Sequence, residues 1–288
     1  MPRLKIWTQS VPLRRWRRDR NWLNRFENRS LAIAALIALP CHAQWTTSLK
    51  PRTVQEFQKY AKTVEEKLQN RWQGRQPFLS IDEDESSRKQ ALKGELVIHP
   101  AVTDNPVSIS GGLIHDWVGT VYIPNAAMEK VLGILQDFDR HSKIYPAVIG
   151  SRLIRRQSND LEGMWRLERK DPLLPVVLDV KQQAHYKQVA PGKWICRAYA
   201  DRISEVENPG STNEKILPPD NGTGFLWRLY AYWSLETVSG GILAECRTVS
   251  LSRDIPTMVN WIIRPFVQKL PRESLASTLE DTRSAASK

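Results

Sequence analysis

The feature that most constrains this chain is a succession of strand-like segments in its second half. Apolar and polar residues alternate there, and turn-rich stretches with few helical residues separate the segments. Ser239-Gly240-Gly241 is typical of a hairpin turn. We therefore predict a single antiparallel meander over Val148 to Arg156, Gly163 to Lys170, Val176 to Val189, Trp194 to Ser204, Gly224 to Thr237, and Ile242 to Arg253.

The segment "GFLWRLYAYWSLET", Gly224 to Thr237, has large rings on both of its faces. Because side chains alternate along a strand, its odd positions form one apolar row, whereas its even positions combine Tyr230 and Tyr232 with polar residues such as Arg228 and Glu236. Aromatic rings on both rows indicate that both faces of the sheet are covered. The odd row is Phe225, Trp227, Leu229, Ala231, Trp233 and Leu235.

Helical patterns before and after the meander predict the helices that would cover the two faces of the sheet. Apolar residues three or four positions apart predict an amphipathic helix from Thr53 to Gln73 and a long helix from Thr257 to about Ala286. The last helix carries Trp261 and Phe266 in its apolar stripe. A further strand, Leu113 to Ile123, and a helix in "AAMEKVLGILQDF" precede the meander. An antiparallel sheet needs its apolar face buried, and the last helix is the expected cover.

Two stretches of the sequence carry a more specific resemblance. They are "HDWVGTVYIPNAAMEKVLGILQDFDRHSKIYPAVIGSRLI" and "RDIPTMVNWIIRPFVQKLPRESLASTLEDTR". Together with the order of elements they resemble the START-like superfamily, also called SRPBCC, over about Leu113 to Ala286. The resemblance implies an α+β helix-grip fold: a seven-stranded antiparallel sheet wrapped around the long C-terminal helix, with strand order 1-7-6-5-4-3-2.

The implied strand order bears on the two cysteines of this region, Cys196 and Cys246. The aromatic strand separates their strands, so roughly two strand spacings, about 9.6 Å, lie between them. That distance is beyond the reach of a disulfide. We expect two unpaired, buried thiols.

The first 43 residues are typical of an export signal. A basic stretch precedes the apolar run Leu31 to Leu39, and small residues at Cys41 and Ala43 suit cleavage after Ala43. We divide the chain into a signal peptide (1–43), an N-terminal extension with the amphipathic helix (44–110) and a START-like domain (111–288). We expect an exported protein, periplasmic or extracellular; anchoring by an uncleaved leader is the second choice.

The leader also accounts for most of the net charge of +11. It holds nine Lys and Arg and two Asp and Glu, so the remaining chain carries 33 basic and 29 acidic residues, a balance of +4. A mildly basic surface of this kind does not favour nucleic acid as a partner.

The resemblance implies a cavity between the sheet and the last helix that takes a hydrophobic molecule, such as a lipid, isoprenoid or quinone. Its expected lining combines the inward apolar rows with three strand charges that would orient a headgroup. Ordinary core packing and solvent-facing cross-strand salt bridges are the alternatives for these residues. The expected ligand-binding residues are Trp117, Val121, Trp227, Leu229, Trp233, Trp261, Phe266, Arg197, Arg228 and Glu245.

Catalytic patterns are few. The sequence has no phosphate-binding glycine loop, zinc-ligand spacing or nucleophile elbow, and "QDFDRH", with Asp137, Asp139 and His141, suits a solvated helix end better than a metal site. His115 is the one histidine to test as a general acid or base, and a structural histidine with satisfied hydrogen bonds is the favoured alternative. We expect a non-catalytic binding protein without cofactor or metal, in transient contact with membranes. A cyclase-like or hydrolase-like enzyme and an interaction module with a filled core are the alternatives.

Overall fold

The computed structural model describes residues 46–170, 175–255 and 260–288, with the side chains of 260–268 outside the description. The chain divides into two units, Met1–Gln44 and Trp45–Lys288. The predicted leader, 1–43, lies outside the described residues, and so do the side chains of Trp261 and Phe266. The fold described below is that of the second unit.

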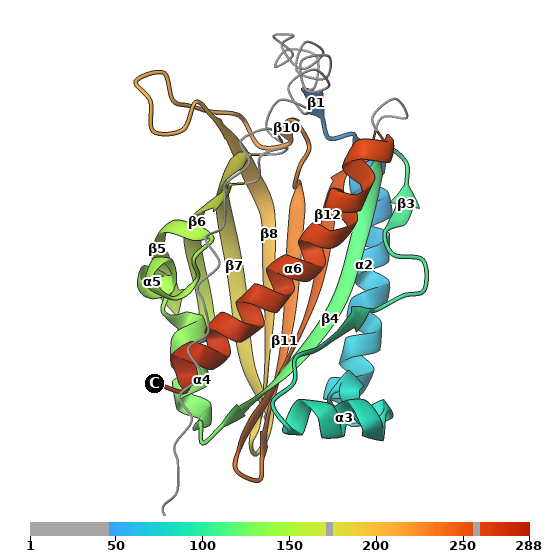
Figure 1. Cartoon of the computed structure of the whole chain (residues 1–288), viewed down its shortest axis with the longest axis vertical. Coiled ribbons are helices and arrows are strands. Elements are labelled where there is room, and N and C mark those ends of the chain that lie inside the picture. The colour runs from blue at the N-terminus through green and yellow to red at the C-terminus, as the bar shows by residue number, and fades with distance from the viewer. Residues whose placement is uncertain (1–45, 171–174, 256–259) are drawn as a thin grey trace, which may run out of the picture. The chain divides into compact units, whose positions relative to one another are not determined.

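One antiparallel sheet forms the frame of this unit (Figure 1). Its seven long strands have the order β4-β12-β11-β8-β7-β6-β5, which is the predicted order 1-7-6-5-4-3-2. Short strands extend it: β2 (Val97–Pro100) and β3 (Val107–Ile109) pair with β4, and β9 (Lys215–Ile216) pairs with β8. A separate two-stranded ribbon joins β1 (Thr47–Ser48) to β10 (Asn221–Gly222). The long strands are β4 (Gly112–Pro124), β5 (Val148–Gln157), β6 (Asp160–Arg169), β7 (Val176–Ala190), β8 (Lys193–Glu207), β11 (Arg228–Val238) and β12 (Gly241–Arg253).

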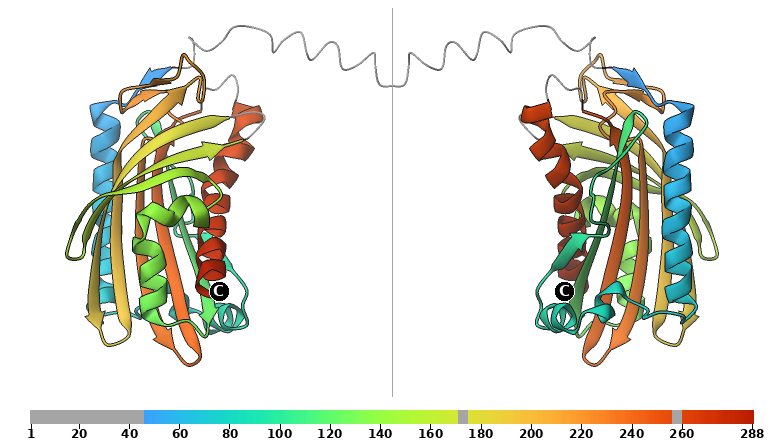
Figure 2. Two further views of the ribbon diagram at one scale, coloured as in Figure 1. Left: turned by 90° about the vertical axis from the view of Figure 1, so that its left-hand side faces the viewer. Right: turned by 90° about the vertical axis from the view of Figure 1, so that its right-hand side faces the viewer.

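The helix α6 (Asn260–Ala286) crosses one face of the sheet, which we call the α6 face (Figures 1 and 2). It packs most closely over β4, where Gly119 leaves room for its side chains: a Cβ on Gly119 would lie 2.6 Å from Leu279 Cδ1. The shorter helices α4 (Met128–Gln136), η3 (Phe138–Arg140) and α5 (His141–Ile144) complete this layer. Phe138 of η3 lies against Gly163 of β6, another position that admits only glycine.

The opposite face is covered by the N-terminal helix α2 (Pro51–Trp72), and we call it the α2 face (Figure 2). The predicted apolar stripe of this helix is buried at Phe57, Ala61, Val64, Leu68 and Trp72. The short helices η2 (Ser80–Glu83) and α3 (Glu85–Leu92) follow it. Both faces of the sheet therefore carry a helical layer, as the two rows of the aromatic strand indicate.

The aromatic strand confirms this division, with one correction. Trp233 and Leu235 belong to the core on the α6 face, whereas Tyr230 and Tyr232 pack under α2. Trp227, which we expected on the α6 face, packs with the α2 cluster instead. The regular strand begins only at Arg228, and the irregular backbone before it, with Gly224 at φ +76°, breaks the alternation that the prediction extended through Trp227.

The two described cysteines are unpaired and buried, as predicted. They lie on either side of Trp233 in neighbouring strands, in register with it. None of the helices in the described ranges is long and apolar enough to cross a bilayer.

Candidate functional site

The α6 face can be followed as four cross-strand rows, each joining β8, β11, β12 and β4 through the strand register. The two rows nearest the β11–β12 hairpin form a closed core. Their central members, including Trp233, Cys246 and Val121, are at most 7% exposed, and Leu275 and Leu279 of α6 pack with them. Two predicted ligand-binding residues, Val121 and Trp233, thus lie in this closed core.

The next two rows differ from the closed core. One row is Ala198, Ala231, Thr248 and Trp117, and the other is Ala200, Leu229, Ser250 and His115. We call these eight residues the upper α6 face; they lie farther from the β11–β12 hairpin turn than the closed core does. Trp117, Leu229, Ala231 and Thr248 remain partly exposed although they sit on central strands of the sheet. Most members of the two rows are small: three alanines, a serine and a threonine.

Apolar side chains continue from the upper α6 face onto β6 and β7. Leu178, Val180, Ala200 and Ile203 form a buried cluster, and Leu229 packs against it with partly buried side chains that include Trp165 and Leu167. The upper α6 face is therefore bordered by apolar surface on its β7 side. The predicted site residues Trp117 and Leu229 both belong to this region.

His115 is the polar residue that this arrangement isolates. It is 2% exposed, and its Nε2 lies 3.1 Å from Ser252 Oγ. Ser252 Oγ in turn donates to the carbonyl of Arg253 at 3.3 Å. In the tautomer that keeps this bond to Arg253, Nε2–H of His115 donates to Ser252 Oγ and the Nδ1 lone pair is left as an acceptor. Among the described residues, Nδ1 is buried without a hydrogen-bond partner.

Burial determines the charge of this imidazole. It lowers the pKa of His115 from 6.5 to about 4, so the ring is neutral near pH 7. A neutral ring with a free lone pair can accept a hydrogen bond from a hydroxyl group, and it can act as a weak base.

The three predicted strand charges do not reach the α6 face, which corrects our expectation. All three lie on the α2 face. Each is two positions along its strand from a residue that also faces α2, namely Tyr199, Tyr230 and Leu243 for Arg197, Arg228 and Glu245 in turn. Arg228 pairs with Asp220 at 2.5 Å. Alternation along each strand fixes this placement: the positions on the α6 face are filled by apolar or small neighbours such as Ala198 and Ala244.

Glu245 has a structural role in this layer. Its carboxylate accepts hydrogen bonds from Ser80 N at 2.9 Å and Ile81 N at 3.2 Å, at the start of η2. It also accepts from the hydroxyls of Ser80 and Thr120. Within the described residues, no arginine forms a salt bridge with Glu245. Arg247 instead makes two hydrogen bonds to Asp116, of 2.9 and 2.6 Å.

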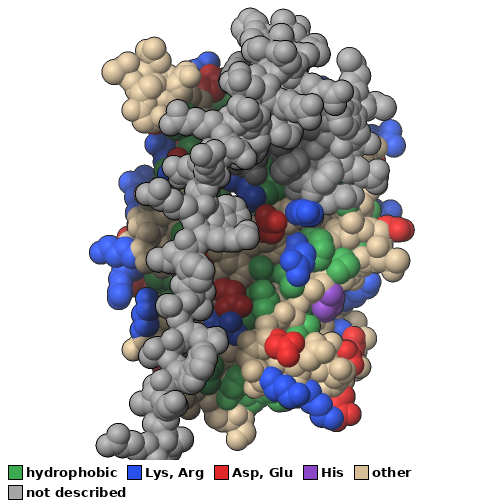
Figure 3. Space-filling view, in the orientation of Figure 1, with side chains coloured by type: hydrophobic (Ala, Val, Ile, Leu, Met, Phe, Trp, Pro, Cys, Tyr) green, Lys and Arg blue, Asp and Glu red, His purple; other side chains and the backbone are tan. Residues whose placement is uncertain are grey.

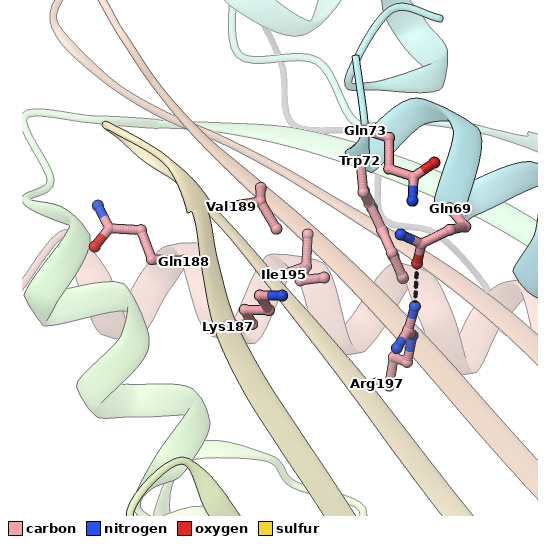
Figure 4. A pocket seen from close by; sticks show the side chains of 8 residues that line it. All are labelled: Gln69, Trp72, Gln73, Lys187, Gln188, Val189, Ile195 and Arg197. Atoms are coloured by element: carbon pink, nitrogen blue, oxygen red, sulfur yellow. Dashed lines mark hydrogen bonds between the residues drawn. The ribbon is translucent and has the colours of Figure 1, made fainter. Parts of the chain in front are cut away.

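Arg197 lines a pocket on the α2 face, at the end of α2 beside the β7–β8 hairpin (Figure 4). The pocket has a volume of about 270 Å³. Arg197 Nη2 donates to Gln69 Oε1 at 2.6 Å, and the guanidinium lies 4.8 Å from the centroid of the Trp72 ring. The full lining is Gln69, Trp72, Gln73, Lys187, Gln188, Val189, Ile195 and Arg197.

The acidic segment around His141 is a packing site. His141 Nδ1 accepts from Trp165 Nε1 at 2.9 Å, and its Nε2 lies 3.1 Å from the carbonyl oxygen of Ile134. Asp139 accepts from the backbone N of Leu153 at 2.8 Å. In the ranges that the structure describes, no group of three or more His, Cys, Asp or Glu side chains is placed to hold a metal ion.

Sequence reasoning missed two parts of these sites. Thr248, Ser250 and Ser252 share one row of β12 with Cys246, and their alternation with apolar residues was the signal that could have placed them beside His115. The pocket at Trp72 joins residues from α2 to residues from β7 and β8. No local pattern brings those segments together, so this pocket could not be read from spacing alone.

The strand order, with one long last helix across one face of the sheet, defines an α+β helix-grip fold. The fold predicted from the resemblance to the START-like superfamily is therefore confirmed. Hydrophobic side chains show on the α6 side between scattered charges of both signs (Figure 3).

Comparison with known proteins gives matches among solved structures alone. No family model matches the chain. No curated protein matches it either. A STAR-related lipid transfer protein fragment from Xanthomonas axonopodis aligns at 17% identity and TM-score 0.40, over 62% of this chain and 96% of that one. Human STARD10 aligns at 14% identity and TM-score 0.39, over 70% and 79%. The Zhui aromatase/cyclase of a Streptomyces species aligns at 9% identity and TM-score 0.39, over 60% and 93%.

Proposed function

We propose that this protein binds a hydrophobic small molecule on the upper α6 face, between the sheet and α6. One observation carries the proposal: side chains on the central strands are closed over in the lower rows but remain partly exposed in the upper rows, at Trp117, Leu229 and Ala231. Partly exposed apolar groups in the middle of a covered sheet are a suitable lining for an apolar ligand.

The polar chemistry of the face narrows the ligand class. His115 Nδ1 is a buried acceptor without a partner among the described residues, and leaving such a group unpaired is costly. A hydroxyl on an otherwise apolar molecule would donate to it. We therefore propose a lipid, an isoprenoid or a reduced quinone that carries a hydroxyl group. A STAR-related lipid transfer protein is among the structures with which the chain aligns.

A cyclase-like or hydrolase-like enzyme on the same face is the second candidate. The observation that favours it is again the free lone pair of His115, which could take a proton from a bound substrate. An aromatase/cyclase is also among the aligned structures. The enzyme hypothesis requires turnover that is lost in His115→Gln while binding is kept, whereas a carrier needs no turnover.

The proposal is tested by mass spectrometry of organic extracts from the full chain purified without detergent. Leu229→Gln makes the lining polar, and Ala231→Phe fills it; Ile216→Gln is the matched control because Ile216 is 52% exposed on β9. We expect a stoichiometric hydrophobic molecule in the wild type and the control and its loss from the two folded site variants. A clean extract from folded wild type, with no rise in melting temperature on adding lipids or quinols, would overturn the proposal.

Export belongs to the same proposal. The basic and apolar leader at 1–43 supports a periplasmic or extracellular protein, and a protein that carries a hydrophobic molecule needs transient contact with a membrane to load or release it. N-terminal sequencing of the exported protein checks the point. A start at Gln44 supports a cleaved, mature form, and an intact leader would instead support anchoring.

A further inference from the structure

We infer that the pocket beside the C-terminal end of α2 is a second binding site, for a small carboxylate with an apolar body. This site lies on the α2 face and does not depend on the function proposed for the α6 face. Three lining residues come from the last turns of α2 and the residue after it, and the others come from β7 and β8, as Figure 4 shows.

The charge of the pocket favours an anion. Its lining contains two cationic side chains, Arg197 and Lys187, and three glutamines, but no aspartate or glutamate. Lys187 is exposed at the mouth. An anion that enters would therefore meet two positive charges and several amide groups, without repulsion from a lining carboxylate.

Arg197 is the group that would anchor it. Within the described residues, Arg197 donates one hydrogen bond, from Nη2 to the neutral amide oxygen of Gln69. Nε is buried and has no hydrogen-bond partner within the described part of the chain. Burying part of a guanidinium without an opposite charge is costly, and a carboxylate is the planar acceptor that matches its donors.

Three other arginines of this sheet, which are buried or partly buried, show what is missing at Arg197. Arg247 has the carboxylate of Asp116, Arg228 that of Asp220, and Arg166 those of Asp179 and Glu214. Arg197 is partly buried as they are, yet its partners in the described chain are an amide and the Trp72 ring. The ligand would supply the carboxylate that the other three receive from the protein.

The rest of the lining selects the body of the ligand. Trp72, Val189 and Ile195 give the pocket an apolar wall. A volume of about 270 Å³ is just below the usual range for small-molecule sites. A short aliphatic or aromatic carboxylate fits both properties, and inorganic anions would leave the apolar wall uncovered.

Titration of the full chain with hexanoate tests this inference, by calorimetry and by the NMR signal of Arg197 Nε–H. We expect saturable binding with a shift of that signal, an affinity about tenfold weaker in Arg197→Gln, and an affinity about threefold weaker in Lys187→Gln. Arg202→Gln is the matched control: Arg202 is exposed on the same strand, outside the pocket. It should bind as the wild type does.

Two further probes separate the contributions of charge and body. Hexanol has the same apolar chain but no charge, and inorganic phosphate is an anion without an apolar chain. Both should bind much more weakly than hexanoate. Equal binding of hexanol, or hexanoate binding that is unchanged in folded Arg197→Gln, would overturn the inference. Because Arg197 lies away from the α6 face, loss of hexanoate binding in this variant should leave any co-purified hydrophobic molecule in place. The two proposals can therefore fail separately.

Discussion

At the scale of single residues, the buried charges of this protein attach its N-terminal extension to the sheet. Asp116 is fully buried, pairs with Arg247 and accepts the hydroxyl hydrogen of Tyr60 from α2 at 2.7 Å. Glu65 accepts hydrogen bonds from the hydroxyls of both Tyr199 and Tyr232. A buried carboxylate is tolerated when such partners surround it. These charges therefore position the layer of α2, while on the α6 face the described residues include an isolated polar group, the imidazole of His115.

That isolated group makes a prediction about pH. Burial lowers the pKa of His115 from 6.5 to about 4, so the unfolded chain binds a proton in this range that the folded chain does not. Stability is therefore lost as pH falls from about 6.5 to about 4, by up to about 3 kcal/mol from this residue.

Urea unfolding of wild type and His115→Gln at pH 7 and pH 4.5 measures the effect. Carboxylates titrate in both proteins, so the difference between the two pH dependences isolates the histidine. The variant should lose less stability than the wild type on acidification. Parallel losses would show that the imidazole is not shielded from solvent.

At the scale of elements, the close approach of α6 to β4 depends on Gly119. A Cβ at this position would lie 2.6 Å from Leu279 Cδ1 and 3.5 Å from Leu275. The helix can move away only by opening the closed core beneath it. The glycine thereby determines how near the C-terminal half of α6 lies to the sheet.

We predict that Gly119→Val lowers the free energy of unfolding by about 1–3 kcal/mol through overpacking. Combining it with Leu279→Ala should recover part of that loss, since the added side chain would occupy the vacated space. Gly133→Ala is the control: Gly133 is exposed in α4, and an added Cβ there meets nothing within 4 Å. It should be neutral or slightly stabilising. Additive losses in the double variant would contradict the packing argument.

At the scale of the whole molecule, the sheet is the middle layer, and a helical layer covers each of its faces. Cys196 and Cys246 lie at its centre, and burial raises the pKa of the Cys196 thiol to about 12. We predict that neither thiol reacts with a disulfide reagent until the protein unfolds globally. In Cys41→Ser, which removes the third cysteine of the chain, the labelling rate should follow the unfolded fraction across a urea series. Rapid labelling in the native protein would show local opening of the sheet.

The architecture was predictable because its signals are periodic. Alternation in the meander and the stripes of two helices were enough to predict the antiparallel sheet covered on both faces, and the resemblance supplied the strand order. The site was less predictable because a short irregular stretch of backbone changes the face of the sheet on which a side chain lies. Because of the irregular backbone before Arg228, Trp227 lies on the α2 face. Alternation along their strands places Arg197 and Glu245 on the same face. Which side of a strand faces which helix depends on the register, and the register is not encoded locally.

The docking of α2 has a consequence for the order in which the protein can be made. This helix is the first long element of the described chain, but Trp72 donates its indole hydrogen to Ser234, 162 positions later. β4, the first long strand, likewise pairs with β12, the last strand. During synthesis, the early elements therefore emerge well before their partners. Neither layer can close until the ribosome has released the chain beyond Arg253, so the nascent protein stays open for nearly the whole of its translation.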